Sequence, residues 1–201
     1  MNQPIKKVSV ISAVPLLAIA LVAVVSSVQA GAVATSVNSS IGSIISVFTS
    51  SGTVAVNVSP TAGGVQTIAN DVITVSTNNA AGYNLTINET TGSSALVSGG
   101  NSIPASAGTF ASPIAQAVNT WGYRIDGAGG FGPGPTSAAS NTAISAVTFA
   151  AVPATASPQT IKSTSSTATN DTTNVWYGVA VNTATPSGSY TNSVTYTAVA
   201  N

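Results

Sequence analysis

The chain has 201 residues but only four Lys or Arg and four Asp or Glu, and it contains neither His nor Cys. That composition excludes a Ser-His-Asp triad, a cysteine nucleophile, a disulfide and a zinc site with the usual ligands. Because the formal net charge is zero, no basic surface is expected to neutralise phosphates, and nucleic acid is not an expected partner.

Hydroxyl and amide side chains supply most of the polarity. The sequence has 29 Ser, 27 Thr and 16 Asn, while 44% of its residues are hydrophobic. The β-branched and aromatic residues occur in short periodic runs, which indicates a folded β-rich domain rather than a disordered Ser/Thr-rich segment.

Residues 1–30 have the three parts of a secretory signal peptide. Lys6 and Lys7 form a positive region, Val8–Val25 is an apolar run, and Val28 and Ala30 stand at positions −3 and −1 of a signal-peptidase cleavage site. Cleavage after Ala30 would leave residues 31–201 as a single domain. The alternative is an uncleaved signal helix that anchors the protein, because about 18 apolar residues come close to spanning a bilayer. Membrane contact is expected only through this segment, and only if it is not cleaved.

The first half of the remaining chain alternates strands and turns. Ile41–Phe48 is an apolar run, and Thr53–Val58 alternates apolar and polar residues as a half-buried strand does. Val72–Thr77 and Tyr83–Asn88 are two further expected strands. The short segment Asn78–Gly82 between them predicts a β-hairpin.

The second half continues the same pattern. We expect a loop at Thr91–Ser112, a strand at Val118–Asp126 and another loop at Gly127–Ser140. Further strands are expected at Ile144–Val152, Gln159–Ser163, Asn174–Asn182 and Tyr190–Val199. About eight to ten short strands without a helical stripe predict an all-β fold, an antiparallel β-sandwich of immunoglobulin-like or jelly-roll-like type.

The four carboxylates are expected at strand ends, where turn and capping roles are common. They are Asp71, Glu89, Asp126 and Asp171. Acid–base catalysis would require two of them to meet, so we expect a noncatalytic protein. Arg124 lies two residues before Asp126 on the same face of a strand, and an exposed ion pair there would contribute up to about 1 kcal/mol.

Lys162 is the only lysine after the signal segment. It is interpreted as a solvated residue that protects a sheet edge near Pro158; a covalent bond to an Asn side chain is the alternative. The glycine-rich segment Gly127–Gly134 lacks the spacing of a phosphate-binding loop. A calcium site beside Asp126 would have one carboxylate and be weak, so no metal and no cofactor is expected.

Four aromatic residues are candidates for ligand binding. Trp121, Tyr123, Trp176 and Tyr177 could form a platform on which sugars stack, although packing in the core is the competing interpretation. Trp176 and Tyr177 are adjacent, so they are expected to point to opposite faces of a strand.

Sheet edges raise a separate question, because native edges are usually protected by Lys, Pro or bulges. With one lysine after the signal segment, prolines must protect the edges, or an edge is meant to pair with another subunit, as in several extracellular fibres.

Three stretches carry a resemblance to known proteins. They are Val72–Asn88, Asn119–Gly127 and Trp176–Asn201, and they resemble uncharacterised small secreted surface proteins of Saccharibacteria-like candidate-phyla bacteria. The last strand is also similar to that of pilin and coat-protein subunits, and more loosely to WxL-type cell-wall-binding domains. Thr195–Thr197 stands where that last family has Trp-x-Leu.

Together these features lead us to expect a secreted, extracellular protein at the cell surface. It would be a structural subunit of a fibre or coat, or an adhesion module. A carbohydrate- or cell-wall-binding module is the first alternative, and a secreted glycosidase-like enzyme is the second. The expected partners are other copies or other surface proteins, with cell-wall glycans as the further candidate.

Overall fold

The computed structural model describes residues 36–135 and 137–201, so the expected signal segment 1–30 lies outside the described residues. The chain divides into two units, Met1–Ser40 and Ile41–Asn201, and every strand of the described residues lies in the second. The described part contains no helix, and hence none long and apolar enough to cross a membrane. The prediction of an all-β fold is confirmed.

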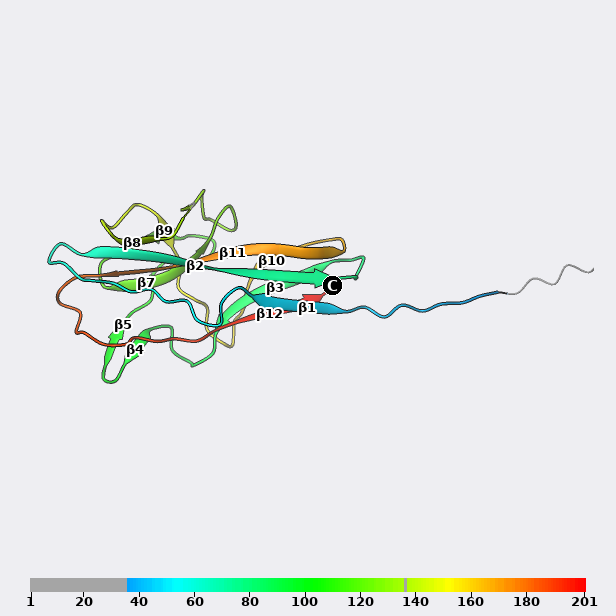
Figure 1. Ribbon diagram of the computed structural model, residues 1–201, viewed down its shortest axis with the longest axis horizontal. Coiled ribbons are helices and arrows are strands. Elements are labelled where there is room, and N and C mark those ends of the chain that lie inside the picture. Colours follow the sequence, from blue (N-terminus) through cyan, green and yellow to red (C-terminus); the bar gives the residue numbers. More distant parts are fainter. Residues whose placement is uncertain (1–35, 136) are drawn as a thin grey trace, which may run out of the picture. The chain divides into compact units, whose positions relative to one another are not determined.

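The strands pair with one another only in the antiparallel direction. In chain order (Figure 1) they are β1 (Ile45–Thr49), β2 (Val65–Thr77), β3 (Tyr83–Glu89), β4 (Leu96–Ser98), β5 (Asn101–Ile103), β6 (Ile114–Ala115), β7 (Thr120–Ile125), β8 (Ala139–Thr142), β9 (Thr148–Phe149), β10 (Gln159–Ser163), β11 (Ala168–Val181) and β12 (Val194–Ala200).

Two long strands form the centre of the first sheet, whose order is β1-β2-β11-β7. β2 and β11 pair from Val65 opposite Val181 to Thr77 opposite Ala168, with a bulge before Asp171. β1 pairs with the end of β2, and β8 pairs with its beginning. Alternation explains the end of β2, because Val75 is fully buried whereas its neighbours are partly exposed.

The second sheet is smaller and has the order β10-β3-β12. Its middle strand follows the alternation in the sequence, since Tyr83, Leu85 and Ile87 are fully buried while Asn84 and Thr86 are partly exposed. Two short pairs, β4-β5 and β6-β9, form separate two-stranded sheets.

Both larger sheets contribute to one hydrophobic core. Ile73 and Val75 of β2 share it with Leu85 and Ile87 of β3 and with Val175 of β11. Antiparallel sheets that share a core are consistent with the predicted β-sandwich. Removal of apolar surface from water, at about 25 cal/mol per Å², is the main free-energy term that stabilises such a core.

The predicted hairpin between β2 and β3 is wrong. The two strands belong to different sheets, and β3 pairs instead with β10 and β12. Each strand has its own apolar face, and both faces are buried in the same core. The connection between them therefore passes from one sheet to the other, with Gly82 at a φ of 83° that favours glycine.

The predicted strand at Thr53–Val58 is also absent, because this segment runs without ladder pairing. The valines of this segment nevertheless pack against the core. The alternation of apolar and polar residues therefore arises from burial of one side and does not indicate a strand. Conversely, β2 begins at Val65, seven residues before the predicted start at Val72. The extra part carries buried polar residues such as Gln66 and Thr67, which obscured the pattern.

Candidate functional site

The four aromatic candidates are in the interior. Trp121 and Tyr123 lie on β7, and Trp176 and Tyr177 lie on β11; their exposed fractions are 3%, 0%, 3% and 7%. Trp121 stacks on Tyr177 with 6.5 Å between ring centroids, and its Nε1 donates to the Ser94 carbonyl at 2.8 Å. These side chains therefore pack the core, and they leave no stacking platform on the surface.

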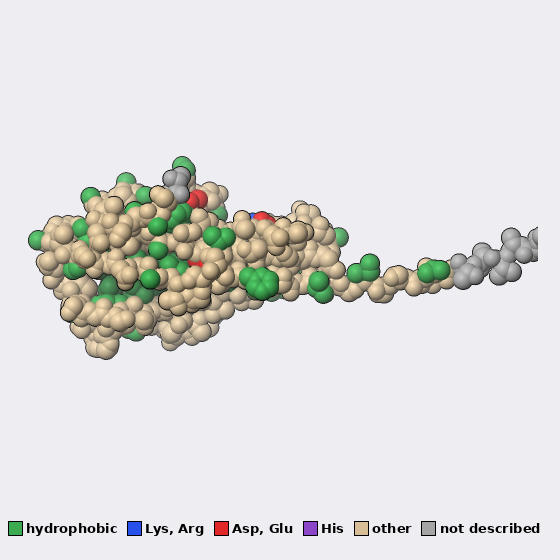
Figure 2. All heavy atoms as spheres, viewed as in Figure 1, with side chains coloured by type: hydrophobic (Ala, Val, Ile, Leu, Met, Phe, Trp, Pro, Cys, Tyr) green, Lys and Arg blue, Asp and Glu red, His purple; other side chains and the backbone are tan. Residues whose placement is uncertain are grey.

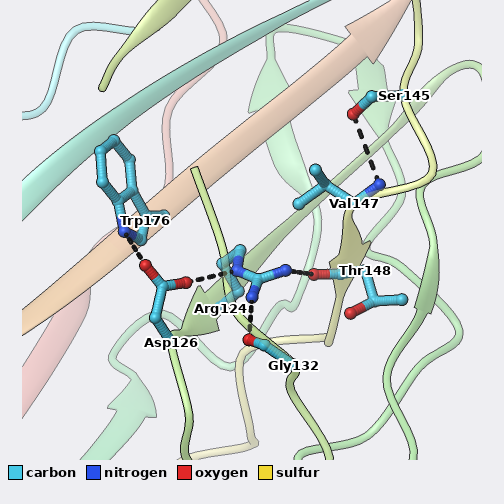
Figure 3. Close-up of polar contacts among 7 residues, drawn as sticks. All are labelled: Arg124, Asp126, Gly132, Ser145, Val147, Thr148 and Trp176. Atoms are coloured by element: carbon cyan, nitrogen blue, oxygen red, sulfur yellow. Dashed lines mark hydrogen bonds and ion pairs between the residues drawn. The ribbon is translucent and has the colours of Figure 1, made fainter. Parts of the chain in front are cut away.

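Trp176 and Tyr177 do point to opposite faces of β11. Tyr177 belongs to the main core, whereas Trp176 packs with Ile68 and Phe149 in a smaller cluster on the other face of the sheet. The Trp176 Nε1 donates to Asp126 Oδ2 at 2.9 Å, as Figure 3 shows.

The same carboxylate holds a buried arginine. Arg124 is 1% exposed, and its Nε donates to Asp126 Oδ1 at 2.8 Å. Its remaining nitrogens donate to the carbonyls of Thr148 and Gly132 at 3.1 and 2.6 Å (Figure 3). The expected pairing of residues 124 and 126 is confirmed, but the expectation that it is an exposed pair is wrong, because the glycine-rich loop covers the guanidinium.

Two features of that loop fit the buried arginine. The Phe131 ring lies 5.5 Å from the guanidinium carbon, at a distance that allows a cation–π contact. A Cβ on Gly134 would lie 1.7 Å from Asp126 Oδ1, so only glycine fits at this position. The predicted loop at Gly127–Ser140 thus closes over an internal polar network.

Glu89 makes a second, separate network. Its carboxylate accepts hydrogen bonds from the backbone of Gly92 at 2.6 Å and of Thr155 at 3.3 Å. Burial acts to raise the pKa of this group, but the hydrogen bonds from Thr155, Gly92 and Thr91 outweigh it and hold the pKa below its usual range. Glu89 therefore fixes two loops as a carboxylate.

Asp171 links the two sheets. Lys162 of β10 reaches it with Nζ 2.5 Å from Oδ1, and the Tyr83 hydroxyl of β3 donates to Oδ2 at 2.9 Å. Lysine is thus on an edge strand as expected, but it is paired rather than solvated. Burial acts to raise the pKa of Asp171, and the contacts with Lys162 and Tyr83 hold it below its usual range.

Asp71 anchors the end of β1. It is 3% exposed, and its Oδ1 accepts hydrogen bonds from the Ser50 hydroxyl at 2.8 Å and the Ser51 backbone at 3.2 Å. Contrary to expectation, Asp71 and Asp171 lie within strands. Three of the four carboxylates thus belong to separate polar networks, and the fourth anchors β1. Residues 36–135 and 137–201 hold no cluster of three metal-ligating side chains.

Two edge strands of the larger sheets, β10 and β7, are protected. β10 follows Pro158 and carries Lys162, which are residues that discourage pairing with another chain. β7 is covered by backbone hydrogen bonds, among them Trp121 N to the Pro104 carbonyl at 3.0 Å and Tyr123 N to the Ala150 carbonyl at 2.9 Å.

Two more edge strands of the larger sheets, β1 and β12, lack such protection. Neither strand contains a charged residue, a proline or a glycine, and each pairs with one neighbour within the described chain. The two strands lie side by side, one at the edge of each larger sheet (Figure 1). One flank of the domain therefore presents two unprotected edges.

Hydrogen-bond phase shows which backbone groups are free there. Ser50 N donates to the Val72 carbonyl, so alternation leaves the N–H and C=O of Ile45, Val47 and Thr49 pointing away from β2. In β12, Asn201 N donates to the Gly82 carbonyl. By the same alternation, the even-numbered residues 194–200 have their N–H and C=O groups on the side away from β3.

Large apolar side chains are exposed on the same two strands. Phe48 on β1 is 66% exposed and Val199 on β12 is 57% exposed, and Ile44 just before β1 is 70% exposed. Charged side chains are almost absent from the face seen in Figure 2. The sequence shows that β1 and β12 lack Lys and Pro. The sequence alone could not identify these two strands as edges.

A comparison with known proteins finds no family model, no curated protein and no solved structure that matches the chain.

Proposed function

We propose that this chain is an exported, noncatalytic cell-surface protein whose copies associate with one another, as a structural subunit of a fibre or coat or as an adhesion module. The single observation that carries the proposal is the flank on which β1 and β12 lie unprotected side by side. Soluble proteins usually protect their edges, so an unprotected pair indicates strands that have a partner.

The surface composition supports the same role. Residues 31–201 carry two basic and four acidic side chains, a net charge of −2, so copies of the exported chain repel one another weakly, and a small net charge promotes association. Hydroxyl and amide groups keep such a surface hydrated, and because they carry no charge, the solubility of the protein should depend little on salt. The fold that we propose for the unit is a β-sandwich of immunoglobulin-like or jelly-roll-like type.

Burial of the four aromatic candidates removes the observation that favoured a carbohydrate- or cell-wall-binding module. Trp121, Tyr123, Trp176 and Tyr177 are each at most 7% exposed, and a sugar needs an accessible ring face. Self-association is therefore the function that we advance.

Light scattering of the purified protein over a hundredfold range of concentration tests the proposal. We expect the mass to exceed that of one chain, and electron microscopy of expressing cells to show surface fibres or a coat. A mass of one chain at every concentration, with bare cells, would overturn the proposed function.

A further inference from the structure

We infer that two copies of this chain pair about a two-fold axis perpendicular to both sheets, with β1 against β1 and β12 against β12. The inference rests on the proposed function and names the partner surface. It begins from the position of the two free edges, which belong to different sheets and lie on one flank. A single two-fold axis through that flank continues both sheets at once, because it keeps each layer in its own plane and reverses strand direction.

The free groups of β1 match themselves. Antiparallel strands bond through alternate residues, and β1 has three residues in the free phase, with Val47 in the middle. When Val47 lies opposite Val47 of the second copy, Ile45 lies opposite Thr49, and every residue of the strand is paired. Such a pairing forms about six main-chain hydrogen bonds, two for each facing pair.

The same register covers the most exposed side chain of the strand. Phe48, 66% exposed, lies opposite Ser46 of the second copy and diagonal to its Phe48. Diagonal neighbours on one face are within reach of aromatic side chains. Each ring is then covered by the other on the outer face of the first sheet.

β12 offers the matching half of the contact. Its free groups also occur on alternate residues, and its seven residues include no charge that would face an equal charge across the axis. Pairing like with like leaves no overhang, whereas β1 against β12 would pair five residues with seven. Because each strand then faces a copy of itself over its whole length, the perpendicular two-fold axis is favoured.

Cysteine cross-linking tests the register, because the chain has no cysteine of its own. Facing residues of a hydrogen-bonded pair have Cα atoms about 5.5 Å apart, within disulfide range. We expect Val47→Cys to give a disulfide-linked dimer under mild oxidation. Thr49→Cys on the same strand is the matched control, since the two Thr49 Cα atoms would lie more than about 13 Å apart.

The outcomes separate this inference from the proposed function. A dimer band at least fivefold stronger for Val47→Cys than for Thr49→Cys supports the two-fold arrangement. Equal bands, or none, from a protein whose wild-type mass exceeds one chain overturn the arrangement and leave self-association standing. Cross-linking of Val47→Cys only to Ala198→Cys on β12 also overturns it. A wild type that stays a single chain overturns both.

Discussion

Trp176 and Asp126 meet across the first sheet, where the indole Nε1 of Trp176 donates to Asp126 Oδ2 at 2.9 Å. The other carboxylate oxygen pairs with Arg124 at 2.8 Å. One carboxylate therefore satisfies an indole and a guanidinium that are both almost fully buried, and it connects the glycine-rich loop to the central strands.

Asp126→Ala should destabilise the domain by about 2 kcal/mol, because it leaves Arg124 buried without its counter-charge. The loss stays below the 3–5 kcal/mol of a fully buried pair, since Asp126 is 32% exposed and Arg124 keeps two carbonyl acceptors. Denaturant unfolding measures the loss. Asp126→Asn, which retains an oxygen for Trp176, should cost less, and an equal cost would contradict this account.

Gly134→Ala should weaken the same network. The new Cβ would collide with Asp126 Oδ1 and crowd Arg124 Nε, so we expect a loss of about 2 kcal/mol, similar to that of Asp126→Ala. Gly132→Ala is the control, because nothing lies within 4 Å of its added Cβ. The effects of Gly134→Ala and Asp126→Ala should not add, and a double variant that loses the sum would show that the two changes are independent.

Lys162→Met should cost less than 1 kcal/mol, in contrast to the buried network. The ion pair with Asp171 has side chains 27% and 32% exposed, and exposed pairs contribute about 0.2–1 kcal/mol. Its contribution should also fall in 1 M salt. Thermal unfolding of both proteins at low and high salt checks this, and a loss above 2 kcal/mol that salt does not change would contradict it.

Stability should be nearly constant from about pH 5 to pH 9, because the chain has no His or Cys to titrate there. The pKa values of Glu89 and Asp171 are below their usual range. Their contribution is therefore present above the unfolded pKa values of about 4, and it is lost as the pH falls through the lower folded values.

The loss of folding stability at high pH arises from groups whose pKa is raised in the folded state. Burial raises the pKa of Tyr83, Tyr177 and Tyr196 above the usual value. The unfolded chain releases these protons first, near pH 10, so stability should fall above that pH. Thermal unfolding from pH 2 to pH 12 measures both limits. Glu89→Gln should lower the melting temperature at pH 7 but not at pH 2, and a uniform decrease would contradict the assignment.

Local patterns predicted the strands whose burial alternates cleanly. Tyr83–Asn88 and Gln159–Ser163 correspond closely to β3 and β10. The first half of β2 was missed, because buried Gln66 and Thr67 find hydrogen-bond partners in distant segments, Gln116 and Asn57. Such partners depend on the tertiary fold, which overrides local propensity.

The flank formed by β1 and β12 could not be predicted from local sequence patterns, because it too depends on the tertiary fold. The sequence shows that Ile45–Thr49 and Val194–Ala200 lack protecting residues, but the two segments are about 150 residues apart in the chain. Only the sheet order places both at edges of one flank. Likewise, spacing predicted the pairing of Arg124 with Asp126, but the cover over Arg124 comes from the fold of the glycine-rich loop.

Sedimentation velocity of an edge-protected variant tests the central claim most directly. Phe48→Lys with Val199→Lys places the natural protecting residue on each free edge, at positions 66% and 57% exposed. Val97→Lys with Ile114→Lys, at positions 44% and 43% exposed on β4 and β6, adds the same charge elsewhere. We predict that the wild type and the second variant associate, while the first stays a folded single chain. Association that survives in the first variant, or is lost equally in both, would contradict assembly through β1 and β12.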